Sequence, residues 1–549
     1  MSRPEKKVFA VLIFISIAYF LVLYFPNAVG SANRDMLAVF EPDEYAQYPH
    51  IIRMLKGGDT FRETLHRFLA YQHYYYGFPF YSISAIFIFP IKLLQGNLEN
   101  TPLVMLVLRQ FVSVLPIIFS ILIFVYIQTR FRSYLATIGL FIFLITIPAI
   151  VKNSLWWHPD SLTVLFITLT FFFLDRDDLQ LGHNFILAAV TCGLATGTKL
   201  IGLFFFLTIP LYLLLGLIYK RIKLQQAAIR AGVFVLVMLG TIVLSNPMLL
   251  SSSGRTAIIS IQRKQAESMS FGWDVAYAKG PASWYPIIRE YYGEWYTIAV
   301  AIVMLLISVR YGFRRILSLL ILSWIIPYSL YILYFIAIKP KHFFIPIILP
   351  LYSGLAMLPL LISKKNPAEL TGRSVRIHAG LRMFGHVALL IIAIQFVRNI
   401  QWDINYYLKQ VTREQTSTSI SFYTTLEQEY LSKIPNTIPL NIYRDIRVYI
   451  PPSSRWDTKI KWGVIDYNYI DDNNFDIVIL SRQRALDYTN EGVIENAQDP
   501  SQMQRTYSFY SDALKGRVEN YQLLFQNDFG LVFISQQLFD KFFANANVP

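Results

Sequence analysis

The stretch Phe40-Glu41-Pro42-Asp43-Glu44-Tyr45 places neighbouring carboxylates shortly after the first long apolar segment of the chain, which covers roughly 8–28. An apolar segment of that length can cross a bilayer. Ionisable side chains held close to the hydrocarbon are costly, and they are usually there for function. The stretch therefore predicts a membrane protein with acidic groups beside the membrane surface.

The composition is that of an integral membrane protein. Of 549 residues, 54% are hydrophobic and only 15% are charged, against about 25% in soluble proteins. The net charge of +14 comes mostly from Lys and Arg in short loops, where such residues set topology and meet membrane lipids. Because no aromatic-basic module or zinc spacing accompanies this charge, we expect no nucleic-acid partner. Cys192 is the single cysteine, so no disulfide can form within the chain.

Apolar segments of suitable length predict about eleven membrane-spanning helices. They cover roughly 8–28, 103–129, 133–151, 161–174, 184–199, 201–219, 228–246, 295–309, 315–338, 342–362 and 383–398. The position of a further apolar stretch, 78–94, is decided by which side of the membrane the basic loops then reach. If it lies in the outer interface, clusters such as Lys220-Arg221 and Lys364-Lys365 fall inside together with Lys6-Lys7. We therefore expect an inner amino terminus and an interfacial 78–94 segment.

This topology predicts a transmembrane domain, 1–399, and an extracytoplasmic domain, 400–549. The first outer loop, 29–102, should carry helices on the membrane surface, because Pro42 suits the first turn of a helix and amphipathic spacing follows it. The last 150 residues are polar and mix strand-like with helical runs, which predicts a small α/β domain. We expect a multi-pass protein of the plasma (inner) membrane, or of the endoplasmic reticulum in a eukaryote, with its active site on the extracytoplasmic or lumenal face.

Acidic residues in two outer segments are candidates for chemistry. Asp43 and Glu44 open a predicted helix, where acids can also simply complement the helix dipole. Adjacent helical residues point in different directions, so Asp43 can face a reactive centre while Glu44 is held by hydrogen bonds. In the turn Trp156-Trp157-His158-Pro159-Asp160, the aspartate can position an acceptor, hold a basic partner, help bind a metal or cap the next helix.

Basic residues gather on the same predicted face. The apolar stretch around Gly197-Thr198-Lys199 must cross the membrane twice, which places Lys199 at the outer level. A lysine there either extends to the interface or holds a lipid phosphate. Lys341 and His342 form another basic point. Together these groups can move a substituent from a phosphate to a hydroxyl, since a carboxylate takes the hydroxyl proton and lysines stabilise the departing phosphate.

In order along the chain, these motifs resemble those of the GT-C membrane glycosyltransferases, above all bacterial protein O-mannosyltransferases and the aminoarabinose transferase of lipid A. The resemblance covers roughly 1–400 and rests on the acidic pair, the aromatic segment 74–81, Gly193 to Gly202, Ser245-Asn246-Pro247 and Lys341 to Pro346. It implies a polytopic helical fold with outer juxtamembrane helices. It also implies inverting transfer from a polyprenyl-phosphate-sugar donor to a glycan, lipid or protein acceptor.

The resemblance implies roles for individual residues. We expect catalytic roles for Asp43 as base, Glu44 as its support and Asp160 as second-loop acid; donor-phosphate binding by Lys199, Lys341, His342 and Arg53; and substrate binding by Tyr45, Trp157 and His158. Relatives often have an arginine just after the acidic pair, where this chain has Ala46 and Gln47. Some GT-C enzymes use a divalent metal, but no ligand cluster in the sequence compels one.

Three alternatives stay open at this level. A lipid or glycan transporter or flippase would place charges within several spans and functional groups on both faces. A membrane scaffold presenting the outer domain would tolerate loss of Asp43, Asp160 and Lys199. An oligosaccharide transferase is the nearest alternative among enzymes. The sequence identifies neither the sugar nor the acceptor.

Overall fold

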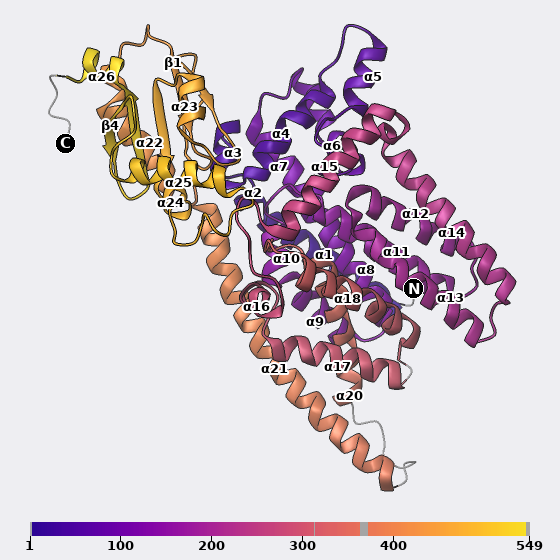
Figure 1. Ribbon diagram of the computed structural model, residues 1–549. Coiled ribbons are helices and arrows are strands. Elements are labelled where there is room, and N and C mark those ends of the chain that lie inside the picture. The colour runs from indigo at the N-terminus through magenta and orange to yellow at the C-terminus, as the bar shows by residue number, and fades with distance from the viewer. Residues whose placement is uncertain (1–2, 312, 363–371, 545–549) are drawn as a thin grey trace.

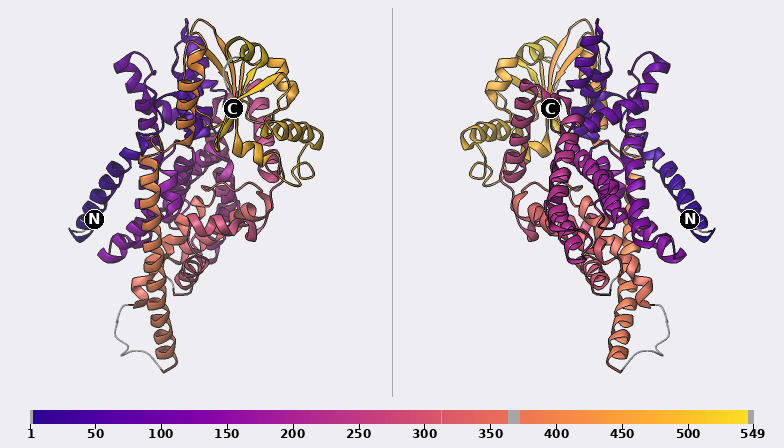
Figure 2. Two further views of the ribbon diagram at one scale, coloured as in Figure 1. Left: turned by 90° about the vertical axis from the view of Figure 1, so that its left-hand side faces the viewer. Right: turned by 90° about the vertical axis from the view of Figure 1, so that its right-hand side faces the viewer.

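The computed structural model describes residues 3–311, 313–362 and 372–544 (Figure 1). Lys364 and Lys365, which contributed to the predicted topology, lie outside the described residues. A large helical bundle is followed by a small part built around a sheet, which lies at one end of the bundle beside the first-loop helices (Figures 1 and 2). The long helix α21 (Gly372–Val411) runs along the bundle and leads into this small part.

The helical bundle begins with an apolar helix, continues with the short helices of the first loop and then with the other apolar helices. Its elements are α1 (Arg3–Val22), α2 (Tyr24–Asn27), α3 (Arg34–Phe40), α4 (Pro42–Leu55), α5 (Phe61–Leu69), α6 (Phe78–Gln95), α7 (Thr101–Leu108), the π-helix η1 (Arg109–Val114), α8 (Leu115–Thr129), α9 (Tyr134–Ile145), α10 (Pro148–Asn153), α11 (Asp160–Asp177), α12 (His183–Thr198), η2 (Leu200–Phe204), α13 (Phe205–Ile218), α14 (Leu224–Ser245), η3 (Pro247–Leu250), α15 (Ser252–Phe271), α16 (Pro281–Tyr291), α17 (Trp295–Tyr311), α18 (Arg315–Phe335), α19 (Ile345–Ser353), η4 (Gly354–Met357), α20 (Leu358–Ile362) and α21.

The protein is a multi-pass membrane protein, although the predicted count of eleven spans is not confirmed. Among the described residues, eight helices are long and apolar enough to cross a membrane, or nine if the bent pair α16–α17 counts as one. All eleven predicted segments are helical over most of their length. Helix α11 fails the test because charged residues stand at both its ends, and α12 because it is short. Helix α6 passes it, so the interfacial position of 78–94 stays a prediction.

The carboxyl-terminal part has an α/β fold, as expected. Its elements are α22 (Thr418–Glu429), η6 (Leu431–Lys433), β1 (Leu440–Arg444), β2 (Trp456–Lys459), α23 (Tyr467–Asn473), β3 (Ile477–Ser481), α24 (Arg482–Asp487), α25 (Pro500–Leu514), β4 (Tyr521–Gln526), β5 (Gly530–Ser535) and α26 (Gln536–Phe542). The sheet order is β2-β1-β3-β5-β4, with β1, β2 and β3 parallel and β5 antiparallel to both its neighbours. Strand β3 is buried on both faces, where apolar residues of the flanking helices cover it.

Ion pairs join this α/β part to the first outer loop. Arg444 at the end of β1 is fully buried and pairs with Asp35 of α3. Arg413, just after α21, lies 3.8 Å from Glu41. The predicted domain boundary at 399/400 falls inside α21, so the division of the chain there stays a prediction. These contacts hold the end of β1 and the segment after α21 against the first outer loop.

Candidate active site

The two neighbouring acids of α4 lie in different environments. Pro42 occupies the first turn of the helix, and the next two side chains diverge from there. Glu44 is fully buried, whereas Asp43 is accessible to solvent although protein surrounds it closely. Burial raises the pKa of Asp43, and this effect outweighs the lowering by the nearby positive charge of Lys199. Asp43 is therefore the acid of this pair that a substrate can reach.

Glu44 belongs to a fully buried ion pair with Arg109. The Nε of Arg109 donates to Glu44 at 2.9 Å, and neither side chain has any exposed surface. The same arginine donates to the carbonyl oxygens of Asn27 at 2.9 Å and Val29 at 3.0 Å. Glu44 also accepts a hydrogen bond from the backbone N–H of Trp157 at 2.7 Å. The pair thus ties the first-loop helix to the end of the first span and to the turn that carries His158 and Asp160.

Sequence reasoning missed Arg109. It lies within a segment that was assigned only as a membrane span, yet an arginine inside such a segment is itself a signal of function or of a buried partner. It also begins the π-helix η1, and single π-helical turns inside α-helices are frequent at functional sites.

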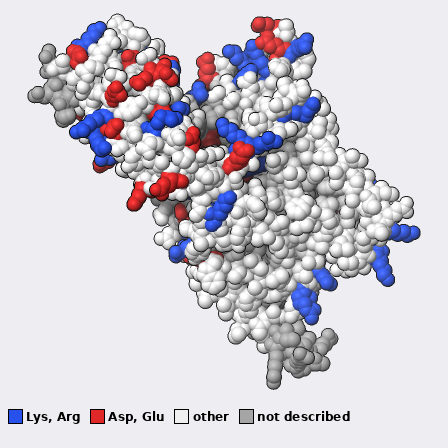
Figure 3. Space-filling view, in the orientation of Figure 1, with Lys and Arg blue, Asp and Glu red and all other residues white. Residues whose placement is uncertain are grey.

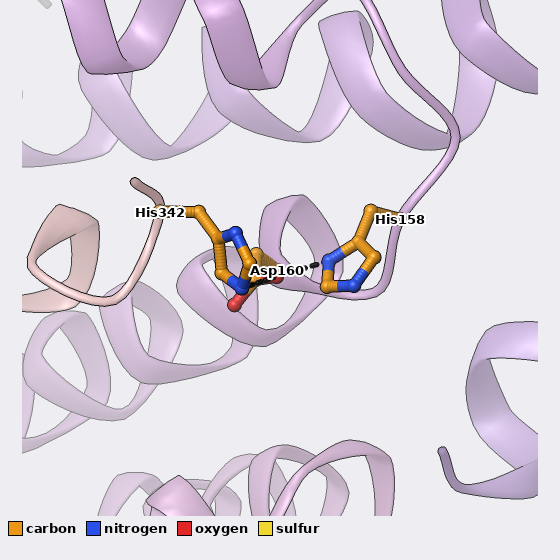
Figure 4. Close-up of side chains that lie close together, drawn as sticks. All are labelled: His158, Asp160 and His342. Atoms are coloured by element: carbon orange, nitrogen blue, oxygen red, sulfur yellow. Dashed lines mark ion pairs between the residues drawn. The ribbon is translucent and has the colours of Figure 1, made fainter. Parts of the chain in front are cut away.

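Asp160 is the centre of the second cluster. It is fully buried at the start of α11, and one of its oxygens accepts a hydrogen bond from Lys199 Nζ at 2.7 Å. Its other oxygen contacts Nδ1 of His158 and lies 3.5 Å from Nε2 of His342. Both histidines thus lie against the same carboxylate oxygen, and their ring centres are 4.7 Å apart (Figure 4). Four residues that the sequence indicated one by one are therefore brought together.

The imidazole of His158 is held on its remaining sides. The ring of Trp156 stacks on it with 4.1 Å between ring centres. The hydroxyl of Tyr76, from the aromatic segment of the first outer loop, is 2.7 Å from its Nε2. Partners of this kind fix the orientation of a histidine ring whose other nitrogen binds a metal or contacts a charged group.

The side chains of His158, Asp160 and His342 can hold a divalent metal. One ligand atom from each lies within 4.8 Å of the others, and two imidazoles with one carboxylate is a donor set found at catalytic zinc sites. The hydrogen bond between Tyr76 and Nε2 of His158 supplies the outer support that such ligands usually have. These three residues therefore fit a metal, although the sequence alone compels none.

An apolar cavity of about 600 Å³ adjoins this cluster. Lys199 and Tyr76 line it at the side of the cluster, and Phe204, Tyr328 and Phe343 are among its apolar lining residues. The Nζ of Lys199 lies 5.0 Å from the ring centre of Phe343. Among the described residues that line this mainly apolar cavity, Lys199 is the one with a positively charged side chain.

The motif Ser245-Asn246-Pro247 takes part in a contact between chain segments beside this cavity. The amide of Asn246 donates to the carbonyl of Gly197 at 3.1 Å and accepts from the backbone N–H of Phe78 at 2.8 Å. Gly77 packs so closely that a Cβ there would lie 1.6 Å from the carbonyl oxygen of Gly197. The glycines thus permit the aromatic segment to dock directly on the break that presents Lys199.

Other predicted site residues lie outside the Asp160 cluster. The side chain of Trp157 is fully buried and donates to Ser84 at 2.9 Å, so it supports the core. Arg53 is exposed and lies near His50. The ring of Tyr45 is 6.4 Å from that of Trp462 in the α/β part. Lys341 makes no ion pair with Asp160 and lies over the ring of Tyr291 instead.

Comparisons with known proteins place this architecture. No protein-family model and no curated protein matches the sequence. The crystal structure of ArnT from Cupriavidus metallidurans bound to undecaprenyl phosphate is similar over 95% of this chain and 97% of that chain, with a TM-score of 0.51 at 11% sequence identity. The chain has a GT-C fold.

Two further solved structures show weaker likeness to this GT-C fold. The apo state of the same ArnT matches with a TM-score of 0.48 at 12% identity, over 95% of this chain and 97% of that chain. The Archaeoglobus fulgidus oligosaccharyltransferase tethered to an acceptor peptide matches with a TM-score of 0.48 at 12% identity, over 90% of this chain and 72% of that chain.

Proposed function

We propose that this protein is an inverting glycosyltransferase that moves a sugar from a polyprenyl-phosphate donor to an acceptor hydroxyl, with Asp43 as general base. The observation that carries the proposal is that Lys199 both lines the apolar cavity and pairs with Asp160. The cavity suits the prenyl chain, and Lys199 suits its phosphate. The structure of ArnT, which shares the fold, contains undecaprenyl phosphate, a lipid of the class proposed here.

The proposed reaction is a single displacement. Asp43 accepts the proton of the acceptor hydroxyl, whose oxygen attacks the anomeric carbon on the face opposite the phosphate. The bond from that carbon to the phosphate oxygen breaks, and the lipid phosphate leaves with the electron pair. Lys199 stabilises the charge that develops on the phosphate. A divalent ion held by His158, Asp160 and His342 would add positive charge beside Lys199.

The supporting role of Glu44 follows from its burial. Its carboxylate is fully engaged with Arg109 and with the backbone of Trp157, so it does not reach a substrate. The ion pair fixes the start of α4 against the turn of His158 and Asp160. We infer that Glu44 positions Asp43 relative to the leaving group.

We also propose that the site faces the extracytoplasmic side. Charged side chains of both signs gather over the α/β part and the first-loop helices, while the body of the bundle is almost without charge (Figure 3). At the opposite end, that view shows Lys and Arg but no Asp or Glu. An excess of basic residues in short loops marks the cytoplasmic side.

Removing the charge of Lys199 should weaken donor binding. A charge-assisted hydrogen bond contributes about 1.5–3 kcal/mol, so Lys199→Gln is expected to lower the affinity for undecaprenyl phosphate by about 10- to 100-fold. Equilibrium binding to the purified protein in neutral detergent measures this. Lys220→Gln, which removes an exposed lysine from the loop after α13, is the control. Unchanged affinity in Lys199→Gln would place the phosphate elsewhere.

The rate should depend on pH through Asp43. Because burial raises the pKa of this carboxyl, it stays protonated to a higher pH than an ordinary aspartate, and a protonated carboxyl cannot act as a base. We expect kcat/KM to rise with pH on an acid limb that lies above the usual aspartate range. Lys199 lowers the pKa of Asp43, so Lys199→Gln should move that limb to higher pH. A limb that does not move in this variant contradicts the assignment.

A further inference from the structure

Two acids flank the proposed base along the chain, and each of them pairs with a buried arginine. Glu44, directly after Asp43, pairs with Arg109. Glu41, two residues before Asp43, lies 3.8 Å from Nη1 of Arg413, an arginine just after α21 whose side chain is only 5% exposed. The start of α4, which carries Asp43, therefore lies between two ion pairs.

The two arginines meet at one backbone carbonyl. Nη1 of Arg109 donates to the carbonyl oxygen of Val29 at 3.0 Å, and Nη2 of Arg413 donates to the same oxygen. A carbonyl oxygen has two lone pairs, so it can accept from both. Nη1 of Arg413 also donates to the side-chain oxygen of Gln410 at 2.8 Å. Both ion pairs are thus tied to the chain segment that follows the first span.

The backbone beside Val29 leaves room for the guanidinium of Arg413. Gly30 has a φ of 82°, in the left-handed region that glycine enters without strain. A Cβ at Gly30 would lie 2.3 Å from Nε of Arg413, so any other residue would push this side chain away. The N–H of Gly30 donates to the carboxylate of Glu414, the residue after Arg413. The position of Arg413 is therefore fixed by the backbone around it as well as by Glu41.

The orientation of Asp43 depends on Glu41, because this one residue joins α3 to α4. Its φ of −139° and ψ of 81° are not helical. Its carbonyl oxygen accepts the first hydrogen bonds of α4, from the N–H groups of Glu44 at 2.9 Å and Tyr45 at 3.2 Å. A displacement of Glu41 therefore moves the helix end that carries Asp43.

Helix α3, on the other side of Glu41, is held at both of its ends. Asp35 in its first turn pairs with the fully buried Arg444 of the α/β part. Phe40, its last residue, packs against Arg413, with 5.1 Å between the guanidinium carbon and the ring centre. Because α3 is fixed in this way, the contacts of Arg413 determine where α3 ends and α4 begins.

We propose that Arg413 is a positioning residue of the active site, which orients the carboxylate of Asp43 by holding Glu41. The inference rests on the proposed function and deepens it. Arg413 and Arg109 act together, because both donate to the carbonyl oxygen of Val29 and each holds an acid beside the base. A misplacement of about 1 Å can lower a rate about 100-fold, so the loss of either ion pair should lower kcat.

Hydrogen exchange of the full-length protein in phosphatidylcholine nanodiscs tests this arrangement without an acceptor. In Arg413→Gln, the N–H groups of Glu44 and Tyr45 should exchange about tenfold faster or more, because the carbonyl of Glu41 that accepts from them is less firmly held. Strand β3, in the core of the α/β part, should exchange as in the wild type. Unchanged exchange at Glu44 and Tyr45 overturns the proposal, and so does an equal rise in β3, which would indicate a general loss of stability.

The kinetic arm follows transfer from undecaprenyl-phosphate-mannose to an alkyl glucoside. Arg413→Gln should lower kcat by about 10- to 100-fold and keep the KM for the donor, because Lys199 and the cavity are unchanged. Arg413→Lys should recover part of the loss, since it keeps a positive charge at Glu41 but lacks the forked donors of arginine. Glu41→Gln weakens the same ion pair and should change exchange and kcat in the same direction; it replaces Arg413→Gln if that variant does not fold. A wild-type kcat in Arg413→Gln, or a rise in donor KM as large as the fall in kcat, contradicts the positioning role.

The matched control is Arg455→Gln in the α/β part. The guanidinium of Arg455 likewise donates to backbone carbonyl oxygens, those of Leu431 at 2.7 Å and Ile434 at 2.6 Å. This variant should keep the wild-type kcat and the wild-type exchange at the start of α4, and equal effects in Arg455→Gln and Arg413→Gln overturn the proposal. Absence of any transfer by the wild type counts against the proposed function, whereas hydrogen exchange still decides the role of Arg413.

Discussion

Asp43→Asn is expected to abolish sugar transfer in a protein that stays folded. Asparagine has the same size but cannot accept the proton of the acceptor hydroxyl, and loss of a general base costs about 10²- to 10⁴-fold in rate. Folding should be unaffected, because the side chain of Asp43 is accessible to solvent and an amide is easier to bury than a carboxylate. Release of polyprenyl phosphate from the donor, measured with the purified protein, gives the rate.

The control for this variant is Asp59→Asn, which changes an exposed aspartate of the same outer loop and should keep the wild-type rate. Thermal unfolding of both variants shows whether the fold is intact. Full activity in Asp43→Asn would falsify the assignment of the base. Glu41, whose pKa is also raised by burial, would then be the next acid to examine.

Arg109→Met is expected to destabilise the protein by about 3–5 kcal/mol. The substitution leaves the carboxylate of Glu44 buried without its counter-charge, and it removes the donors to the carbonyl oxygens of Asn27 and Val29. The cost is large because a charge isolated from water and from any partner is far less stable than a paired one. Denaturant unfolding in a fixed detergent measures the change.

A double variant separates the unpaired charge from the loss of packing. Glu44→Gln removes the negative charge but keeps an oxygen for the backbone N–H of Trp157. Arg109→Met/Glu44→Gln should therefore be more stable than Arg109→Met alone. If the single variant is as stable as the wild type, the pair does not hold the first loop in the way described.

Local sequence signals were sufficient for the parts of the site that stand next to apolar segments. Asp43, Asp160 and Lys199 each stand close to such a segment, where the cost of burying a charge made them candidates for function. The helix after Pro42 and the α/β fold of the tail were also predicted, because helix-start signals and strand-like runs are local.

Long-range geometry accounts for what the sequence did not show. Lys341 and His342 are neighbours, and only the packing of their turn against Tyr292 sends one to Tyr291 and the other to Asp160. Arg444 is far along the chain from Asp35, and the folded α/β part brings the two together in an ion pair. The pairing of Glu44 with Arg109 likewise depends on how two helices pack.

A structure of the protein with undecaprenyl phosphate tests the central claim most directly. The account predicts that the phosphate lies within hydrogen-bond distance of Lys199 Nζ, that the prenyl chain occupies the cavity between Phe204, Tyr328 and Phe343, and that Asp43 faces the phosphate across a gap that admits a sugar. A phosphate bound away from Lys199, with this cavity free of lipid, would contradict it.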